Sequence, residues 1–184
     1  MLFRLSVSLV SRWEMQEKII FRKAIETDTE EIGQIILDAK EQMRLRNSRQ
    51  WQNGYPASED IDRDIQSGYG YVLCEGNRVV AYGAVIFDGE PAYRLIQGKW
   101  HTEDPYVAVH RLAVSVKRVK CGLATRFMQE VEKLSCRKEI YSFRVDTNFD
   151  NLYMLRLLTT LEFNYCGEIR YDREVRKAYD KNLR

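Results

Sequence analysis

The sequence predicts an α/β fold in which a mixed central sheet of six or seven strands is flanked by helices on both faces. Short β-rich runs alternate with amphipathic helical segments in the order βααβββαβαββ. The run at 106–115 is apolar on both of its faces, which is typical of a central strand. Neither an internal repeat nor a linker rich in Gly, Pro or Ser divides the chain, so we expect one continuous domain.

The first part of this domain predicts one strand and two helices. A strand at 19–22 precedes a helix that we expect to begin with a capping box formed by Thr27 and Glu30. Ser58 is expected to cap a second helix, which Gly68 ends. The first helix has apolar residues on one face: Ile32, Ile35, Ile36, Ala39 and Met43.

A hairpin and the central strand come next. The runs 69–75 and 79–87 meet at Gly76-Asn77, which is a hairpin signal, and we expect 88–105 to be a long excursion. In the strand at 106–115, simple alternation places Val107, Val109 and Ala113 on one face and Ala108, Leu112 and Val114 on the other.

The last part predicts two more β/α steps and a closing hairpin. We expect a helix at 122–136, a strand at 141–147 and a helix that Asp150 or Asn151 caps and that runs to Leu161. The final hairpin is predicted at 165–169 and about 174–179.

Composition limits the partners and the compartment. The 184 residues suit one domain at 19–184 with an N-terminal extension at 1–18. Lys and Arg number 29 against 27 Asp and Glu, so the formal net charge of +2 gives no case for nucleic acid. The apolar run Leu5–Val10 is too short for a membrane span, and no other stretch approaches about 18 apolar residues. We therefore expect a soluble cytoplasmic protein with no membrane partner.

Cysteines and histidines limit the metal chemistry. The four cysteines fit neither a CxxC zinc motif nor a dense disulfide framework, so we expect reduced thiols: Cys74, Cys121, Cys136 and Cys166. Because the chain has only two histidines, a His-rich metal site is excluded, and we expect no metal.

The turn after the central strand carries the functional signal. A helix opens at Gly122, and a helix N-terminus presents unpaired N–H groups and the positive end of its dipole. Gly122 and Ala124 leave room for a phosphate to approach the backbone. Three basic residues lie beside them: Lys117, Arg118 and Lys120. The pattern favours an anion cradle for a diphosphate, with an ordinary strand–turn–helix as the alternative. No G-x-G-x-x-G or G-x-x-x-x-G-K-S/T motif is present.

This turn resembles the pyrophosphate loop of the GCN5-related N-acetyltransferases, Gln/Arg-x-x-Gly-x-Gly/Ala. Residues 119–124 match it, except that Val119 replaces Gln or Arg. The stretches 144–154 and 161–167 resemble the family's later motif, a strand, an Asn-x-x-Ala/Met helix and Leu-Gly-Phe-x-x-x-Gly, with Glu162 where Gly is usual. Strand order agrees over nearly the whole domain.

The resemblance implies direct transfer of an acetyl group from acetyl-CoA to an amine. It also implies that two central strands splay apart and that the pantetheine arm pairs with the backbone of one of them. The cofactor-binding residues expected on this basis are Leu112, Ala113, Val114, Val119, Lys120, Cys121, Gly122, Leu123, Ala124, Thr125 and Asn151.

His110 is the candidate catalytic base. A lysine-like amine near pKa 10.4 needs about 4.6 kcal/mol to lose its proton at pH 7, and an α-amine near 8 needs about 1.4 kcal/mol. An imidazole with an ordinary pKa of about 6.5 suits that proton transfer, and period 2 places His110 on the face of Leu112. A packing histidine is the alternative. A backbone N–H near Val114 is the candidate oxyanion donor, while the family's usual acid, a Tyr, falls at Leu158, which cannot donate.

The acceptor is the least determined partner. Trp51, Tyr55 and the 88–105 excursion are expected to wall its pocket, with packing as the alternative for both aromatics. A small-molecule amine and a peptide or protein amine both fit, and a homodimer is left open. A different class of function is a non-catalytic acyl-CoA-binding regulatory module, which Val119 and Leu158 favour. A third is a protein-interaction domain with a vestigial cradle.

Overall fold

A computed structural model describes residues 18–103, 105–171 and 174–184. The extension at 1–18 lies outside these residues, except for Lys18. The described chain forms one sheet with the strand order β1-β2-β3-β5-β6-β8-β7-β4. Its strands are β1 (Ile19–Lys23), β2 (Gly70–Glu75), β3 (Arg78–Ile86), β4 (Gln97–Gly98), β5 (Tyr106–Val114), β6 (Ser142–Thr147), β7 (Asn164–Tyr171) and β8 (Glu174–Asn182). The helices are α1 (Thr29–Leu45), α2 (Ser58–Gln66), α3 (Leu123–Arg137) and α4 (Leu152–Thr160), with short 3-10 turns η1 (Glu26–Asp28), η2 (Pro91–Leu95) and η3 (Val116–Arg118).

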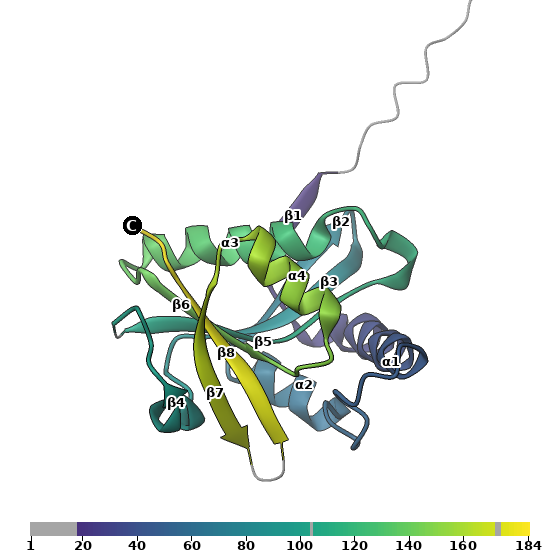
Figure 1. Cartoon of the computed structure of the whole chain (residues 1–184). Coiled ribbons are helices and arrows are strands. Elements are labelled where there is room, and N and C mark those ends of the chain that lie inside the picture. Colours follow the sequence, from purple (N-terminus) through teal and green to yellow (C-terminus); the bar gives the residue numbers. More distant parts are fainter. Residues whose placement is uncertain (1–17, 104, 172–173) are drawn as a thin grey trace, which may run out of the picture.

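The helices cover both faces of the sheet, which confirms the predicted fold class (Figure 1). On one face, α3 and α4 bury residues such as Phe127 and Leu158 against the central strands. On the opposite face, α1 and α2 bury Ile32, Ile36 and Ile61 against β2 and β3. Helical apolar stripes therefore pack on the sheet as their spacing predicts.

The sheet has eight described strands, one or two more than predicted. The added strand, β4, pairs Gln97 with Glu168 and Gly98 with Gly167 inside the expected excursion. A two-residue strand is too short to show alternation in a sequence. A Cβ at Gly98 would lie 2.1 Å from the Cys166 carbonyl oxygen, so this crossing requires glycine.

Two helix starts differ from the prediction. Thr27 lies inside η1, and Asp28 accepts the Ile25 N–H at 2.9 Å while pairing with Arg22 at 2.6 Å. At α2, Asp60 accepts the Ala57 N–H at 2.9 Å. In both places an aspartate accepts the N–H of the residue three positions before it. The capping side chains are therefore Asp28 and Asp60, not the predicted Thr27 and Ser58.

The central strand β5 contains a β-bulge. His110 pairs with Ala84 and Ala113 pairs with Tyr82, so two residues of β5 lie opposite Gly83. Arg111, at the bulge, has φ of +57°. Because one residue is added, Leu112 packs with Val107 and Val109 against the α3 side, and Ala113 packs toward α1 and α2. The predicted face assignment beyond 110, including the shared face of His110 and Leu112, is wrong for this reason.

The parallel strands β5 and β6 separate along their length. They pair at Tyr106–Ser142, Val107–Phe143 and Ala108–Arg144. Beyond these pairs, β5 continues to Val114 and β6 to Thr147 without further pairing between them. The sheet thus opens between its two central strands, as the family resemblance implied.

No helix in the described ranges has the length and apolarity that a bilayer crossing requires.

Candidate active site

The N-terminus of α3 forms an open, uncapped cradle. Gly122 precedes the helix with φ of +69°, and Lys120 also lies in the left-handed region with φ of +62°. No described side chain caps the first turn of α3, so its backbone N–H groups point outward without partners from the helix. A Cβ at Gly122 would meet nothing within 4 Å. Outward amides, left-handed residues and free space suit an anion such as a diphosphate.

The basic residues beside this cradle have different partners. Arg118 forms an ion pair with Glu75 of β2, which offsets its positive charge. Lys117 and Lys120 are exposed, as is Val119, which has 55 % of its surface accessible. The positive potential of the cradle therefore comes mainly from the two lysines and the helix dipole.

The end of β5 offers an unpaired backbone edge. Ala113 and Val114 pair with Tyr82 and Ala81 of β3 on one side. Their other side faces the opening toward β6, where the two strands no longer pair. An extended molecule such as a pantetheine arm can add to such an edge as a strand would. The assignment of Leu112, Ala113 and Val114 to cofactor binding stays a prediction that this geometry suits.

His110 and Asp146 face each other across the start of the opening. Each lies two residues beyond the last β5–β6 pair, Ala108–Arg144, on opposite strands. The His110 Nδ1 is 3.7 Å from the Asp146 Oδ1. Period 2 explains why both side chains point to the α1 and α2 face, because the bulge comes only after His110. The acid and the imidazole thus meet at the point where the strands separate.

Asp146 is held by three further side chains. Tyr93 donates its hydroxyl to Oδ1 at 2.8 Å, Tyr171 donates to the same oxygen at 3.4 Å, and Arg176 donates to Oδ2 at 3.1 Å. The Asp146 side chain is fully buried. Buried charge needs this degree of pairing, so the carboxylate is fixed in orientation.

His110 has one side without a hydrogen-bond partner. Its Nε2 is buried, forms no hydrogen bond with any described residue, and lies 3.6 Å from Glu90 Oε2. Burial lowers the pKa of His110 below its usual value, although Asp146 and Glu90 favour the charged form. The imidazole is therefore neutral near pH 7, with a nitrogen free to accept a proton.

A second buried ion pair adjoins this site. Arg111 donates to both carboxylate oxygens of Asp64 in α2, at 2.7 and 2.6 Å, and to the Tyr55 hydroxyl at 2.5 Å. The Tyr82 hydroxyl also donates to Asp64, at 2.5 Å. This arrangement ties α2 and the loop before it to the bulge of β5, so it fixes one wall beside His110.

The remaining predicted residues lie in different environments. Trp51 is 6 % exposed and packs among apolar residues of α1 and α2, so its position is that of a packing residue. Tyr55 is half-buried against Arg111, and burial raises the pKa of its phenol. Asn151 caps α4 through Met154 N–H at 3.1 Å and donates to Gln50 Oε1 at 2.7 Å. All three assignments stay predictions. Cys121 Sγ is exposed and lies 3.6 Å from the Val119 carbonyl oxygen.

The sequence reasoning missed the polar groups around His110. These are Glu90, Tyr93, Asp146, Tyr171 and Arg176. Asp146 shares a predicted strand face with Ser142 and Arg144, which is typical of a solvent-facing polar side, so alternation gave no signal that it is buried. The others come from the excursion and the last hairpin, and local patterns do not show that these segments meet.

Comparisons with known proteins agree with this geometry. The model of the acetyltransferase (GNAT) family matches residues 36–163. An acetyltransferase of the GNAT family from Streptococcus agalactiae is 34 % identical, with a TM-score of 0.81, over 89 % of this chain and 95 % of that one. A GNAT-family acetyltransferase from Listeria monocytogenes has a TM-score of 0.71 at 18 % identity, over 89 % and 94 % of the two chains.

One structural neighbour was solved with the co-substrate. The yncA protein of Salmonella typhimurium, with its cofactor acetyl-CoA, has a TM-score of 0.62 at 14 % identity, over 91 % of this chain and 95 % of that one. Among curated proteins, none matches the sequence. With a family model covering more than half of its length, this chain belongs to the acetyltransferase (GNAT) family and is an acyltransferase that uses acetyl-CoA as its co-substrate.

Proposed function

We propose that the protein transfers the acetyl group of acetyl-CoA directly to a primary amine, with His110 as general base. The observation that carries this proposal is the His110–Asp146 pair at the point where β5 and β6 separate. A thioester whose diphosphate sits at α3 and whose pantetheine arm follows β5 has its acyl end directed toward this point. His110 is the neutral imidazole available there.

Each nitrogen of His110 has a distinct part in this proposal. We assign the proton to Nδ1, which faces the fully buried Asp146, so that the Nε2 lone pair, on the side of the partly exposed Glu90, accepts the proton of the amine. The attacking amine forms a bond to the acetyl carbon and passes its proton to Nε2. The C–S bond of the thioester then breaks, and coenzyme A departs as a thiolate that takes up a proton from solvent. The imidazolium that forms then lies between Asp146 and Glu90, 3.7 and 3.6 Å away, and both carboxylates stabilise it.

The surrounding charges support a cationic acceptor at the start of the reaction. Glu90, Asp146 and Glu174 carry three negative charges, and Arg176, which contacts the latter two, carries one positive charge. An ammonium group is attracted to such a site before it loses its proton. Small-molecule amines and peptide amines both satisfy this condition.

An amine panel with acetyl-CoA tests the proposal. Thiol release measures turnover. The mass of the product, and the finding that its acetyl group is bound to nitrogen, identify the reaction. We expect release that requires the amine and an equal amount of N-acetyl product. Tight binding of coenzyme A without turnover on any amine would instead support the non-catalytic acyl-CoA-binding module, which the buried Leu158 favours because it has no hydroxyl to donate.

A further inference from the structure

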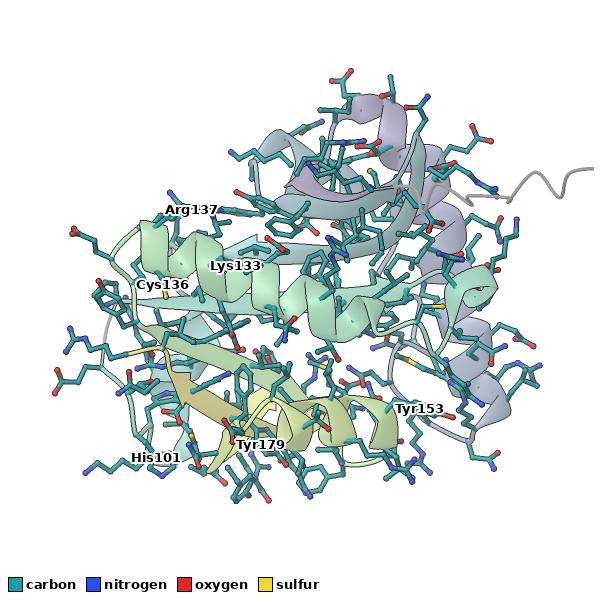
Figure 2. The ribbon with its side chains drawn as sticks, turned by 90° about the horizontal axis from the view of Figure 1, so that it is seen from above. His101, Lys133, Cys136, Arg137, Tyr153 and Tyr179 are labelled. Atoms are coloured by element: carbon teal, nitrogen blue, oxygen red, sulfur yellow. The ribbon has the colours of Figure 1, made fainter. Side chains whose placement is uncertain are left out.

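A second cluster of chemically active side chains lies away from the cradle, where β4, β7 and β8 meet. His101 follows β4, Cys166 lies in β7 and Asp180 lies in β8. The His101 Nδ1 is 3.1 Å from Asp180 Oδ1 and 3.3 Å from Cys166 Sγ, and the three ligand atoms all lie within 4.8 Å of one another. Figure 2 labels His101 at this edge of the molecule, apart from α3.

The backbone around Cys166 directs its thiol into the cluster. Tyr165 pairs with Tyr179 and Gly167 with Ala178, so Cys166 is the extra residue of a bulge in β7. Bulges re-aim side chains, and this one points the thiol inward, where it is 6 % exposed. The Lys99 N–H donates to the Cys166 carbonyl at 2.9 Å, which fixes the segment leading to His101 against the bulge.

Asp180 is oriented by its second oxygen. Its Oδ2 accepts the His101 N–H at 2.6 Å, the Thr102 N–H at 2.8 Å and the Thr102 hydroxyl at 3.0 Å. Oδ1 faces His101 Nδ1, and the Asp180 side chain is fully buried. Hydrogen bonds that hold one carboxylate oxygen and present the other are the usual surroundings of a metal-binding carboxylate.

We propose that His101, Cys166 and Asp180 form a binding site for one zinc ion. A tetrahedral zinc with bonds of about 2.0–2.3 Å separates neighbouring ligand atoms by roughly 3.3–3.6 Å. The observed separations of 3.1 and 3.3 Å are within a few tenths of an ångström of that spacing. A thiolate with an imidazole and a carboxylate suits zinc better than magnesium or calcium, which prefer oxygen ligands alone.

The site is accessible from solvent. The His101 side chain is 54 % exposed and lines a cavity of about 370 Å³ together with Glu103 and Glu139. Cys166 and Asp180 are buried behind it, so the exposed His101 side of the cluster is where zinc would enter and where a water would complete its coordination. On binding, the Cys166 thiol proton is released to solvent, and the imidazole coordinates through Nδ1 with its proton on Nε2. The other two ligands lie 65 and 79 residues from His101, so neither the spacing of the cysteines nor the number of histidines brings these three residues together in the sequence.

Zinc and cobalt titrations of the chelator-treated full chain test the site. We expect competition with a chromophoric chelator to show one tight zinc equivalent, and cobalt to give thiolate-to-cobalt charge-transfer absorption. His101→Ala and Cys166→Ser should each weaken zinc binding at least about tenfold, and Cys166→Ser should abolish the charge-transfer band. Asp180 is left unchanged because its oxygens hold backbone N–H groups that the fold needs.

Cys136→Ser is the matched thiol control. Cys136 lies on α3, well separated from His101 in Figure 2, so its loss should leave zinc affinity and the cobalt spectrum unchanged. The proposal is overturned if the native chain takes up no stoichiometric zinc. It is also overturned if uptake persists at full affinity in the His101→Ala and Cys166→Ser double variant. Circular dichroism of each variant shows that a loss of binding is not a loss of fold.

Discussion

Replacement of His110 by Gln isolates the proposed base with little change in volume. The side chain is 11 % exposed, and glutamine keeps polar atoms within reach of Asp146. Nevertheless, glutamine cannot take up a proton near neutral pH. We expect turnover at pH 7 to fall by about 10²–10⁴, the usual contribution of a general base. Affinity for coenzyme A should hold, because the cradle at α3 contains no contact to His110.

The electrostatic part of this effect follows from the distances. Attraction between protonated His110 and Asp146 at 3.7 Å is on the order of 4 kcal/mol at an effective dielectric constant of about 20. That attraction is comparable to the cost of about 4.6 kcal/mol for deprotonating a lysine-like amine at pH 7. Burial outweighs this attraction, since the pKa of His110 is lowered overall. The imidazole therefore stays unprotonated before the reaction, and Asp146 limits the cost that burial adds to forming the imidazolium.

Thiol-release rates from pH 6 to 9 provide the assay. Without the base, the variant depends on acceptor that is already neutral, so its rate should rise about tenfold per pH unit below the pKa of the amine. The difference in rate between the variant and the native enzyme should therefore shrink as the pH rises. Lys133→Gln, on the exposed surface of α3 (Figure 2), serves as control. A His110→Gln enzyme that matches the native rate throughout this range would remove His110 from the mechanism.

Three other variants probe the cradle, the wall of the site and the fold. Gly122→Val should weaken binding of coenzyme A at least tenfold by calorimetry, because a branched side chain at φ of +69° is strained and fills the open space; undiminished affinity would contradict the cradle. Asp64→Asn should lower the free energy of unfolding by about 3–5 kcal/mol in urea, because it leaves the guanidinium of Arg111 buried without its carboxylate; a change near zero would contradict that pairing. Gly33→Ala, in α1 with open space around the added Cβ, should raise the free energy of unfolding by about 0.5–1 kcal/mol. Stability should also decrease below about pH 6.5, because the unfolded chain then protonates His110 while the folded chain, with its lowered pKa, does not; His110→Gln should remove this dependence in pH-dependent denaturation.

Local patterns determined most of the elements. The apolar spacing of α1 and α3 predicts their buried faces, because a helix can bury only one stripe of residues against a sheet. The cradle was equally readable, since the strand, the turn and the helix start at Gly122 are contiguous in the chain. Asp150 or Asn151 was expected to cap α4, and it is the Asn151 oxygen that accepts the Met154 N–H. Each of these features depends on residues within a few positions of one another.

The arrangement around His110 depends on distant segments. Alternation along β5 cannot reveal the bulge at Arg111, which the pairing with β3 imposes and which reverses the faces beyond it. Tyr93, Asp146 and Arg176 belong to three separate segments that meet only in the folded sheet.

By itself, the sequence determined the α/β class, the order of its strands and helices apart from β4, and the turn before α3 where we expect a diphosphate, because hydrophobic period and helix-terminus chemistry are local properties. Only the tertiary structure decided which carboxylate faces His110, that Arg118 pairs with Glu75, and which cysteine lies beside His101. Those contacts follow from strand register and long-range packing, and neither is encoded in the spacing of neighbouring residues.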